Sequence, residues 1–151
     1  MGTVAEKTRD DIEKYGCTVM NVMEEGELPP FTYSIGIARK TGEPEVVVIG
    51  LKRELAHFIV NEYNRRVRGG EHFESGRLYS GFVEGFDLLA EEVPLSAYVE
   101  YFGRGLEYYE GPRFRVLQLV YPSTSGVWPW SPEASESFRN RQPVLARSGR
   151  A

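Results

Sequence analysis

The chain has 151 residues and a net charge of −4, and 41% of its residues are hydrophobic. A chain of this length suits one domain and buries about 68–70% of its unfolded surface on folding, so its core needs neither disulfides nor metal. The acidic balance gives no global nucleic-acid-binding footprint. Cys17 is the single cysteine, which excludes an intramolecular disulfide and a cysteine-rich zinc site.

The sequence has no apolar segment typical of a secretory signal, and no apolar run approaches the roughly 18 residues of a transmembrane helix. We therefore expect a cytoplasmic protein that binds neither membrane nor nucleic acid. The composition leaves the oligomeric state open, between a monomer and a homodimer.

The first thirty residues predict a helix, a strand and a loop. Residues 3–15 form the helix, which Gly16 ends. Residues 17–23 are typical of a strand. Residues 24–30 form the loop, because a pair of prolines there prevents regular strand pairing.

The centre of the sheet is predicted from two strands joined by a polar turn. Residues 31–38 are rich in aromatic and β-branched side chains, and residues 39–42 supply the turn. Residues 45–49 then run without a polar break after Glu45, as in a strand that is buried on both faces.

The middle of the chain contains its strongest helical pattern. Residues 52–68 place apolar side chains at helical spacing, and two glycines end this helix. Residues 69–81 form a polar loop interrupted by glycines, with the mixture of side chains found in functional loops. Residues 82–93 predict one strand or a pair of short strands.

The last third predicts another helix and another strand. Residues 94–109 fit a helical stripe, although Gly103 and Gly105 weaken it and favour two pieces. Residues 114–121 predict a central strand, because both of its faces are largely apolar. Residues 122–132 form an aromatic turn.

These elements together indicate a single α+β domain over residues 1–132. We expect two layers, with a mixed or mainly antiparallel sheet of about five strands and two or three helices packed on it. Residues 133–151 are polar and rich in arginine, and we expect them to form a solvated C-terminal tail.

Several short blocks resemble one known family when they are taken in order. They are Tyr15-Gly16, FTYSIGI at 31–37, GEPE at 42–45, QLVYP at 118–122, Gly126, WPW at 128–130 and QPVL at 142–145. This pattern resembles the bacterial domain of unknown function numbered 4262, over nearly the whole chain. Ser123 stands where that family often has an acidic residue. The resemblance implies a self-contained bacterial domain and carries over no catalytic residue.

A metal site is not expected. His57 and His72 are the only histidines, and a site would have to combine them with Glu71 or Glu74. The helix rise alone would separate the two histidines by roughly 20 Å. We therefore predict no metal and no cofactor.

Nucleophilic catalysis has little support in the sequence. Ser34 does not lie in a G-x-S-x-G turn. Cys17 opens a predicted strand, where a lone cysteine is usually a small core residue. It would act as a nucleophile only if His57 or His72 packed beside it.

Aromatic side chains offer a better site hypothesis. Tyr33, Tyr121, Trp128 and Trp130 fall at strand ends and in an adjacent turn, and Gln118 lies inside the preceding strand. His72 and Arg77 in the polar loop complete the candidates. Rings with a polar group next to a buried amide can line a small pocket, with Arg77 or Arg115 pairing an anion. The alternative is structural: at least one tryptophan packs on the sheet, and neighbouring backbone satisfies Gln118.

The leading functional hypothesis is a binding module for a small polar or anionic ligand, or for a protein partner. One alternative is a small enzyme that uses His72 or Tyr33 as general acid or base. Another is a protein–protein interaction subunit of the immunity or adaptor kind, which should expose an apolar patch. Whether the protein is an enzyme is left open by the sequence.

Overall fold

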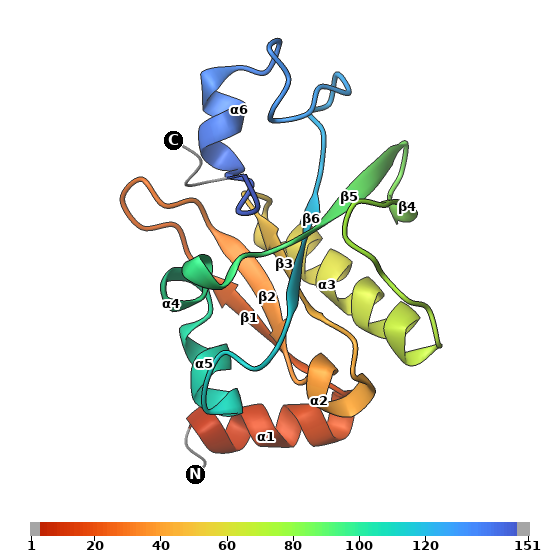
Figure 1. The fold of residues 1–151 in the computed structure, drawn as a ribbon, viewed down its shortest axis with the longest axis vertical. Helices are drawn as coiled ribbons and strands as arrows, with labels where there is room; N and C mark the ends of the chain where they lie inside the picture. Colours follow the sequence, from red (N-terminus) through yellow and green to blue (C-terminus); the bar gives the residue numbers. More distant parts are fainter. Residues whose placement is uncertain (1–3, 148–151) are drawn as a thin grey trace.

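The computed structural model describes residues 4–147, so the predicted helix start at residue 3 and the last four tail residues lie outside the described chain. One sheet of six strands runs through the molecule in the order β1–β2–β3–β6–β5–β4 (Figure 1). The strands are β1 (Thr18–Val22), β2 (Phe31–Ile35), β3 (Glu45–Ile49), β4 (Leu78–Val83), β5 (Phe86–Glu92) and β6 (Val116–Val120). Neighbouring strands are antiparallel except β3 and β6, which are parallel.

Helices cover both faces of this sheet. They are α1 (Val4–Tyr15), α2 (Ile37–Thr41), α3 (Arg53–Arg68), the 3-10 helix η1 (Leu95–Ala97), α4 (Tyr98–Tyr101), α5 (Gly103–Tyr109) and α6 (Glu136–Arg141). The prediction of a single α+β domain with a mixed sheet is confirmed, with one strand and several short helices more than expected. Within the described residues, no helix combines the length and apolar character needed to cross a bilayer.

The two central strands separate two hydrophobic clusters. Val46 and Val48 face the cluster beneath α3, while Val47 and Ile49 face the cluster beneath α4 and α5. Side chains alternate along a strand, so a strand covered on both faces needs an unbroken apolar run. The prediction for residues 45–49 is therefore confirmed.

The predicted turn after β2 is wrong in detail, because residues 37–41 form helix α2 and the strand ends at Ile35. The cause is the buried carboxylate of Glu45. It accepts hydrogen bonds from the backbone N–H groups of residues 36–38 and from the hydroxyl groups of Ser34 and Tyr109. The N–H groups at a helix start have no partner within the helix, so a carboxylate that accepts their hydrogen bonds stabilises the helical conformation there.

The polar loop predicted at residues 69–81 is shorter in the structure. Strand β4 begins at Leu78 and pairs with β5 through a turn at residues 84–85, so the predicted pair of short strands is a hairpin that starts earlier. Leu78 is 55% exposed, which explains why apolar patterning did not reveal this strand. The helical stripe at residues 94–109 is divided, as expected: α4 ends before Phe102, and α5 starts at Gly103.

The segment after Pro132 differs from the expected solvated tail. It forms α6 and then packs on the core, where Gln142, Val144 and Leu145 are buried. The Gln142 side chain accepts a hydrogen bond from the backbone N–H of Tyr121 and donates one to the carbonyl of the same residue. This amide therefore extends the hydrogen bonding of β6, which explains how a polar side chain is buried there.

Candidate functional site

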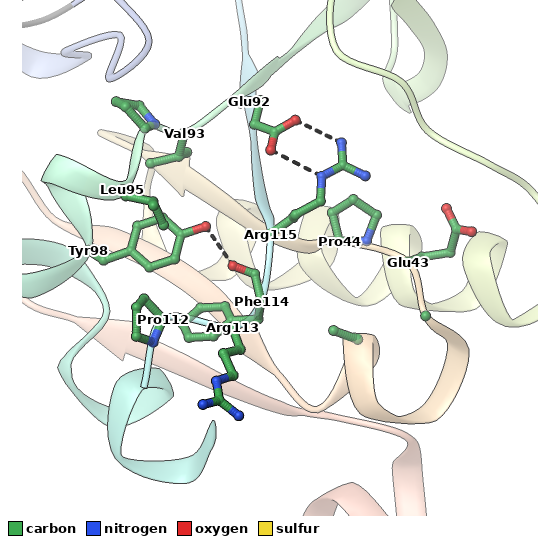
Figure 2. A pocket seen from close by; sticks show the side chains of 13 residues that line it. Glu43, Pro44, Glu92, Val93, Leu95, Tyr98, Pro112, Arg113, Phe114 and Arg115 are labelled. Atoms are coloured by element: carbon green, nitrogen blue, oxygen red, sulfur yellow. Dashed lines mark hydrogen bonds and ion pairs between the residues drawn. The ribbon is translucent and has the colours of Figure 1, made fainter. Parts of the chain in front are cut away.

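A hollow of about 670 Å³ lies at the edge of the sheet where β3 and β6 begin. Three chain segments surround it: residues 42–44 before β3, residues 92–95 at the end of β5, and residues 112–115 before β6 (Figure 2). Ala38 and Tyr98 complete the lining. The pairing of β6 with β3 on one side and with β5 on the other brings these distant segments together.

The walls of this hollow are mainly apolar. They include three prolines, Pro44, Pro94 and Pro112, whose fixed φ restricts how far the segments can move. Tyr98 donates a hydrogen bond from its hydroxyl to the carbonyl of Phe114 at 2.7 Å, and the two rings lie 5.1 Å apart. The wall is therefore held in place before any ligand arrives.

Charged side chains line the rim. Arg115 donates two hydrogen bonds to Glu92, at 3.0 and 2.7 Å, and these bonds lower the pKa of the Glu92 carboxyl. On the opposite side, the Glu43 carboxylate lies 2.8 Å from Nδ1 of His72. Arg113 has no ion pair or hydrogen bond with any described residue, and in Figure 2 its guanidinium points away from the Glu92–Arg115 pair.

Glu45 lies directly behind this hollow. Its backbone N–H donates to the carbonyl of Arg115 at 2.8 Å, while its carboxylate accepts a hydrogen bond from Ala38 in the first turn of α2. Burial raises the pKa of this carboxyl, and hydrogen bonds from Tyr109, Ala38, Ser34 and Gly36 oppose that shift. The side chain is 1% exposed, so it supports the wall and cannot contact a ligand.

Tyr33, which the sequence suggested as a site residue, lies in the core. It is 3% exposed and packs edge-on against Phe102, with ring centroids 5.1 Å apart. Burial raises the pKa of its hydroxyl to about 12. At neutral pH this group is therefore not suited to take a proton from a substrate in water.

Gln118 and Tyr121 are also buried, on and just after β6. Gln118 donates to the carbonyl of Pro143 and accepts from the N–H of Leu145, both at 2.9 Å. Tyr121 donates from its hydroxyl to the carbonyl of Ile49 at 2.7 Å. Neighbouring backbone satisfies Gln118, as the structural alternative proposed.

The remaining sequence candidates lie in separate places. Trp128 and Trp130 stack at 5.3 Å, and the guanidinium of Arg147 covers Trp130 at 3.9 Å. Arg77 forms an ion pair with Glu74 next to β4. His72 alone approaches the hollow, through its contact with Glu43. The structure therefore does not gather these residues around one pocket.

The two histidines have separate partners. His57 lies 3.3 Å from the side-chain amide of Asn21, whereas His72 contacts Glu43. Among residues 4–147, no three His, Cys, Asp or Glu side chains converge as metal ligands would. Cys17 is 4% exposed, and burial raises the pKa of its thiol to about 12, which opposes formation of the thiolate nucleophile.

A second hollow, of about 330 Å³, lies between the start of α3 and the β4–β5 hairpin. Its lining is almost entirely apolar and includes Leu51, Leu55, Val83, Phe86, Leu88 and Phe138. Leu55 is 38% exposed at its edge. This is the kind of surface that the adaptor hypothesis requires.

The sequence suggested Arg115 as a residue that could pair with an anion, but it did not suggest Arg113 or the apolar wall. The available signal was the group of residues 112–115, in which two arginines alternate with Pro112 and Phe114 just before a central strand. Where the chain is extended, successive side chains point to opposite sides, so the two arginines lie on the side opposite to Phe114. The segments that meet there are not neighbours in the sequence, so the wall itself left no local signal.

The open mixed sheet, with helices on both faces and a hollow at one edge, defines a single-domain α+β protein with a preformed pocket. Residues 11–135 match a family model described as "Domain of unknown function (DUF4262)". This match spans most of the chain, so the chain belongs to that family, and the resemblance predicted from the sequence is confirmed. Comparison with curated proteins and with solved structures finds no match for the chain.

Proposed function

We propose that the protein is a non-catalytic binding module whose hollow at the start of β3 and β6 takes a small anion with an apolar body. The observation that carries this proposal is Arg113, a cation without a described partner on the rim of an apolar-walled cavity. Small-molecule sites commonly combine such walls with a few polar groups that orient the ligand. We place this function in the cytoplasm of a bacterium, in keeping with the lone free cysteine and the family resemblance.

The charges around the hollow favour an anion over a cation. Both carboxylates of the lining are already engaged, Glu92 by Arg115 and Glu43 by His72. A cationic ligand would have to share one of these carboxylates with its present partner. An anion would meet an unshared group, because Arg113 offers a planar donor that matches carboxylate or phosphate.

The apolar wall sets the rest of the ligand. Pro94, Leu95 and Pro112 present aliphatic surface beside the rings of Tyr98 and Phe114. Leu95 is 63% exposed, so covering it with a ring or a short alkyl chain removes apolar surface from water. An aryl or short-chain carboxylate is therefore the simplest ligand class that uses both features.

The test is an NMR titration with phenylacetate, with benzylamine as a cation of similar size. We expect phenylacetate to shift amide signals around the hollow and benzylamine to have little effect. Arg113→Gln should weaken phenylacetate binding by about tenfold or more, since a charge-assisted hydrogen bond contributes about 1.5–3 kcal/mol. Arg53→Gln is the matched control, because Arg53 is also exposed without an ion pair to a described residue and lies beyond the opposite end of β3 from the hollow.

Two results would contradict the proposal. One is equal binding of benzylamine and phenylacetate, which would show that charge does not select the ligand. The other is unchanged phenylacetate affinity in Arg113→Gln. The enzyme alternative has less support, because Tyr33 is buried and His72 is exposed outside the lining.

A further inference from the structure

We propose that β1 accepts an extended acidic peptide of a partner protein as an additional strand. This surface is separate from the hollow described above and does not depend on it. The peptide would lie in a groove of about 650 Å³ along β1, between α1 and α3. The two helices pack beside the strand from different sides (Figure 1).

The outer edge of β1 is open. β1 lies at one end of the sheet order and pairs only with β2, in unbroken register over all five of its residues. An edge strand in an antiparallel sheet directs alternate N–H and C=O groups away from its neighbour. Among the described residues, no hydrogen bond from another segment reaches the backbone of residues 18–22 on that side.

The open edge also lacks the usual protection against strand addition. Native edges are commonly interrupted by bulges, prolines or charged side chains. The sequence of β1, TVMNV, contains no proline and no charged residue. The opposite edge, β4, differs: its register shifts between Tyr79 and Val83, and Gly81 there has a φ of +89°. The two edges are therefore not equivalent, and β1 is the better template.

The groove flank on α3 determines the chemistry of the occupant. Arg53, His57 and Asn61 line this flank, and Arg53 is exposed with no ion pair to a described residue. The one carboxylate in the groove, Asp11, already accepts hydrogen bonds from Lys7 and Thr18. The unneutralised charge is thus positive, which favours an acidic side chain on the occupant.

The geometry of strand addition fixes where that acidic side chain must stand. Every second side chain of an added strand points to the same face of the sheet. The acidic residue must therefore belong to the set that faces α3, next to Arg53 and His57. The intervening residues face the opposite side, where Met20 and Val22 pack against the other hydrophobic cluster.

A second copy of the chain fits this edge less well. Pairing β1 with its own copy about a two-fold axis normal to the sheet would place both α3 helices on the same face. Each copy would then bring an unpaired Arg53 to that face, and β1 itself has no acidic side chain to pair with it. A single extended acidic peptide supplies that missing partner and can fill the groove.

The experiment uses a fluorescein-labelled peptide with a Thr-Val-Glu-Val-Thr core and a twin in which Lys replaces Glu. Fluorescence anisotropy should show at least tenfold tighter binding of the Glu peptide to the unmodified protein. Arg53→Glu should reverse this preference. Lys52→Glu, an equal charge change at the adjacent exposed residue outside the groove, should leave it unchanged.

Backbone pairing is tested separately from charge. Two variants of the Glu peptide carry backbone N-methyl groups. In one, the methylated nitrogens point to one side of the extended peptide, and in the other they point to the opposite side. An added strand uses the N–H groups of one side only. We expect one of them to bind and the other to fail. Hydrogen exchange should slow at amides of residues 18–22 on peptide binding and remain unchanged in β4.

Several outcomes would overturn the proposal. The first is no binding of the Glu peptide at millimolar concentration, and the second is equal binding of both N-methylated peptides. The third is an unaltered preference in Arg53→Glu. A fourth is a concentration-dependent dimer that protects the amides of residues 18–22 without peptide, since this would assign the edge to a second copy.

Discussion

The hydrogen bonds from Gln118 to the C-terminal segment lead to a quantitative prediction. Gln118 is fully buried, and its amide bonds the carbonyl of Pro143 and the N–H of Leu145. Gln118→Leu keeps a similar volume and leaves both backbone groups without this partner. A buried group left unsatisfied costs about 1–3 kcal/mol, so we expect a loss of roughly 3 kcal/mol in the free energy of unfolding.

Urea unfolding followed by circular dichroism measures this loss. With a slope of about 2 kcal/mol per molar, the midpoint should fall by roughly 1.5 M while the slope stays the same. Asn140→Leu provides the control, because this exposed amide on α6 has no described hydrogen bond, and its replacement should change stability by less than about 0.5 kcal/mol.

A truncation separates the hydrogen bonds from other effects of the leucine. Ending the chain after Arg141 removes both backbone groups that Gln118 bonds. The truncation itself should destabilise the fold strongly, since it also removes the buried Leu145. In this background, Gln118→Leu should cost much less than in the full chain. Equal costs in the two backgrounds would refute the reasoning.

Three further predictions concern pH, thiol reactivity and backbone conformation. Two arginines lower the pKa of Glu62 to about 2, so Glu62 stabilises the fold above pH 4.5 and loses this effect as pH falls through about 2. Glu62→Gln should therefore lower stability at pH 7 by about 1 kcal/mol, because solvent screens the pair, and the difference should vanish near pH 2 in thermal melts. Iodoacetamide should label Cys17 in urea but barely in the native protein, as mass spectrometry would show; rapid native labelling would contradict its burial. Gly50→Ala should cost more than about 3 kcal/mol, since the new Cβ would lie 2.2 Å from the carbonyl oxygen of Arg141 at a φ of +86°. Gly42→Ala, at a φ of +80° with open space around it, should cost only about 1 kcal/mol.

The central strands and the long helix could be predicted because their signals are local. Residues 46–49 form the apolar run typical of a strand covered on both faces, and α3 repeats its apolar side chains at helical spacing. The α+β class followed from the order of these elements. Short-range patterns of this kind do not depend on which distant segment supplies the packing.

Helix α2 could not be predicted, because its cause lies elsewhere in the chain. Its first N–H groups bond Glu45, which is itself held by Tyr109 from α5. The C-terminal segment was misjudged for a related reason. Gln142 is polar, and polarity normally indicates exposure, but its amide happens to reach both backbone groups of Tyr121.

The candidate hollow could not be predicted from the sequence for a different reason. Its lining comes from residues 42–44, 92–95 and 112–115, and none of these segments has a distinctive pattern alone. Strand-end aromatic residues such as Tyr33 were better signals in the sequence, and the structure uses that residue in the core. A site formed by convergence can be predicted only after strand order is known.

The strand order also bears on how the chain folds. Strands β1, β2 and β3 form one antiparallel unit, and β4, β5 and β6 form another; only the parallel pairing of β3 with β6 joins the two halves of the sheet. Pairing β3 with β6 closes a long loop of intervening chain. The conformational entropy lost in closing this loop opposes folding until the contacts between the two halves have formed. We therefore expect refolding from urea in milliseconds to seconds rather than microseconds, with the seam between the halves as the slow step. Stopped-flow refolding of variants at Val46 and Leu117, which face each other across that seam, would measure it.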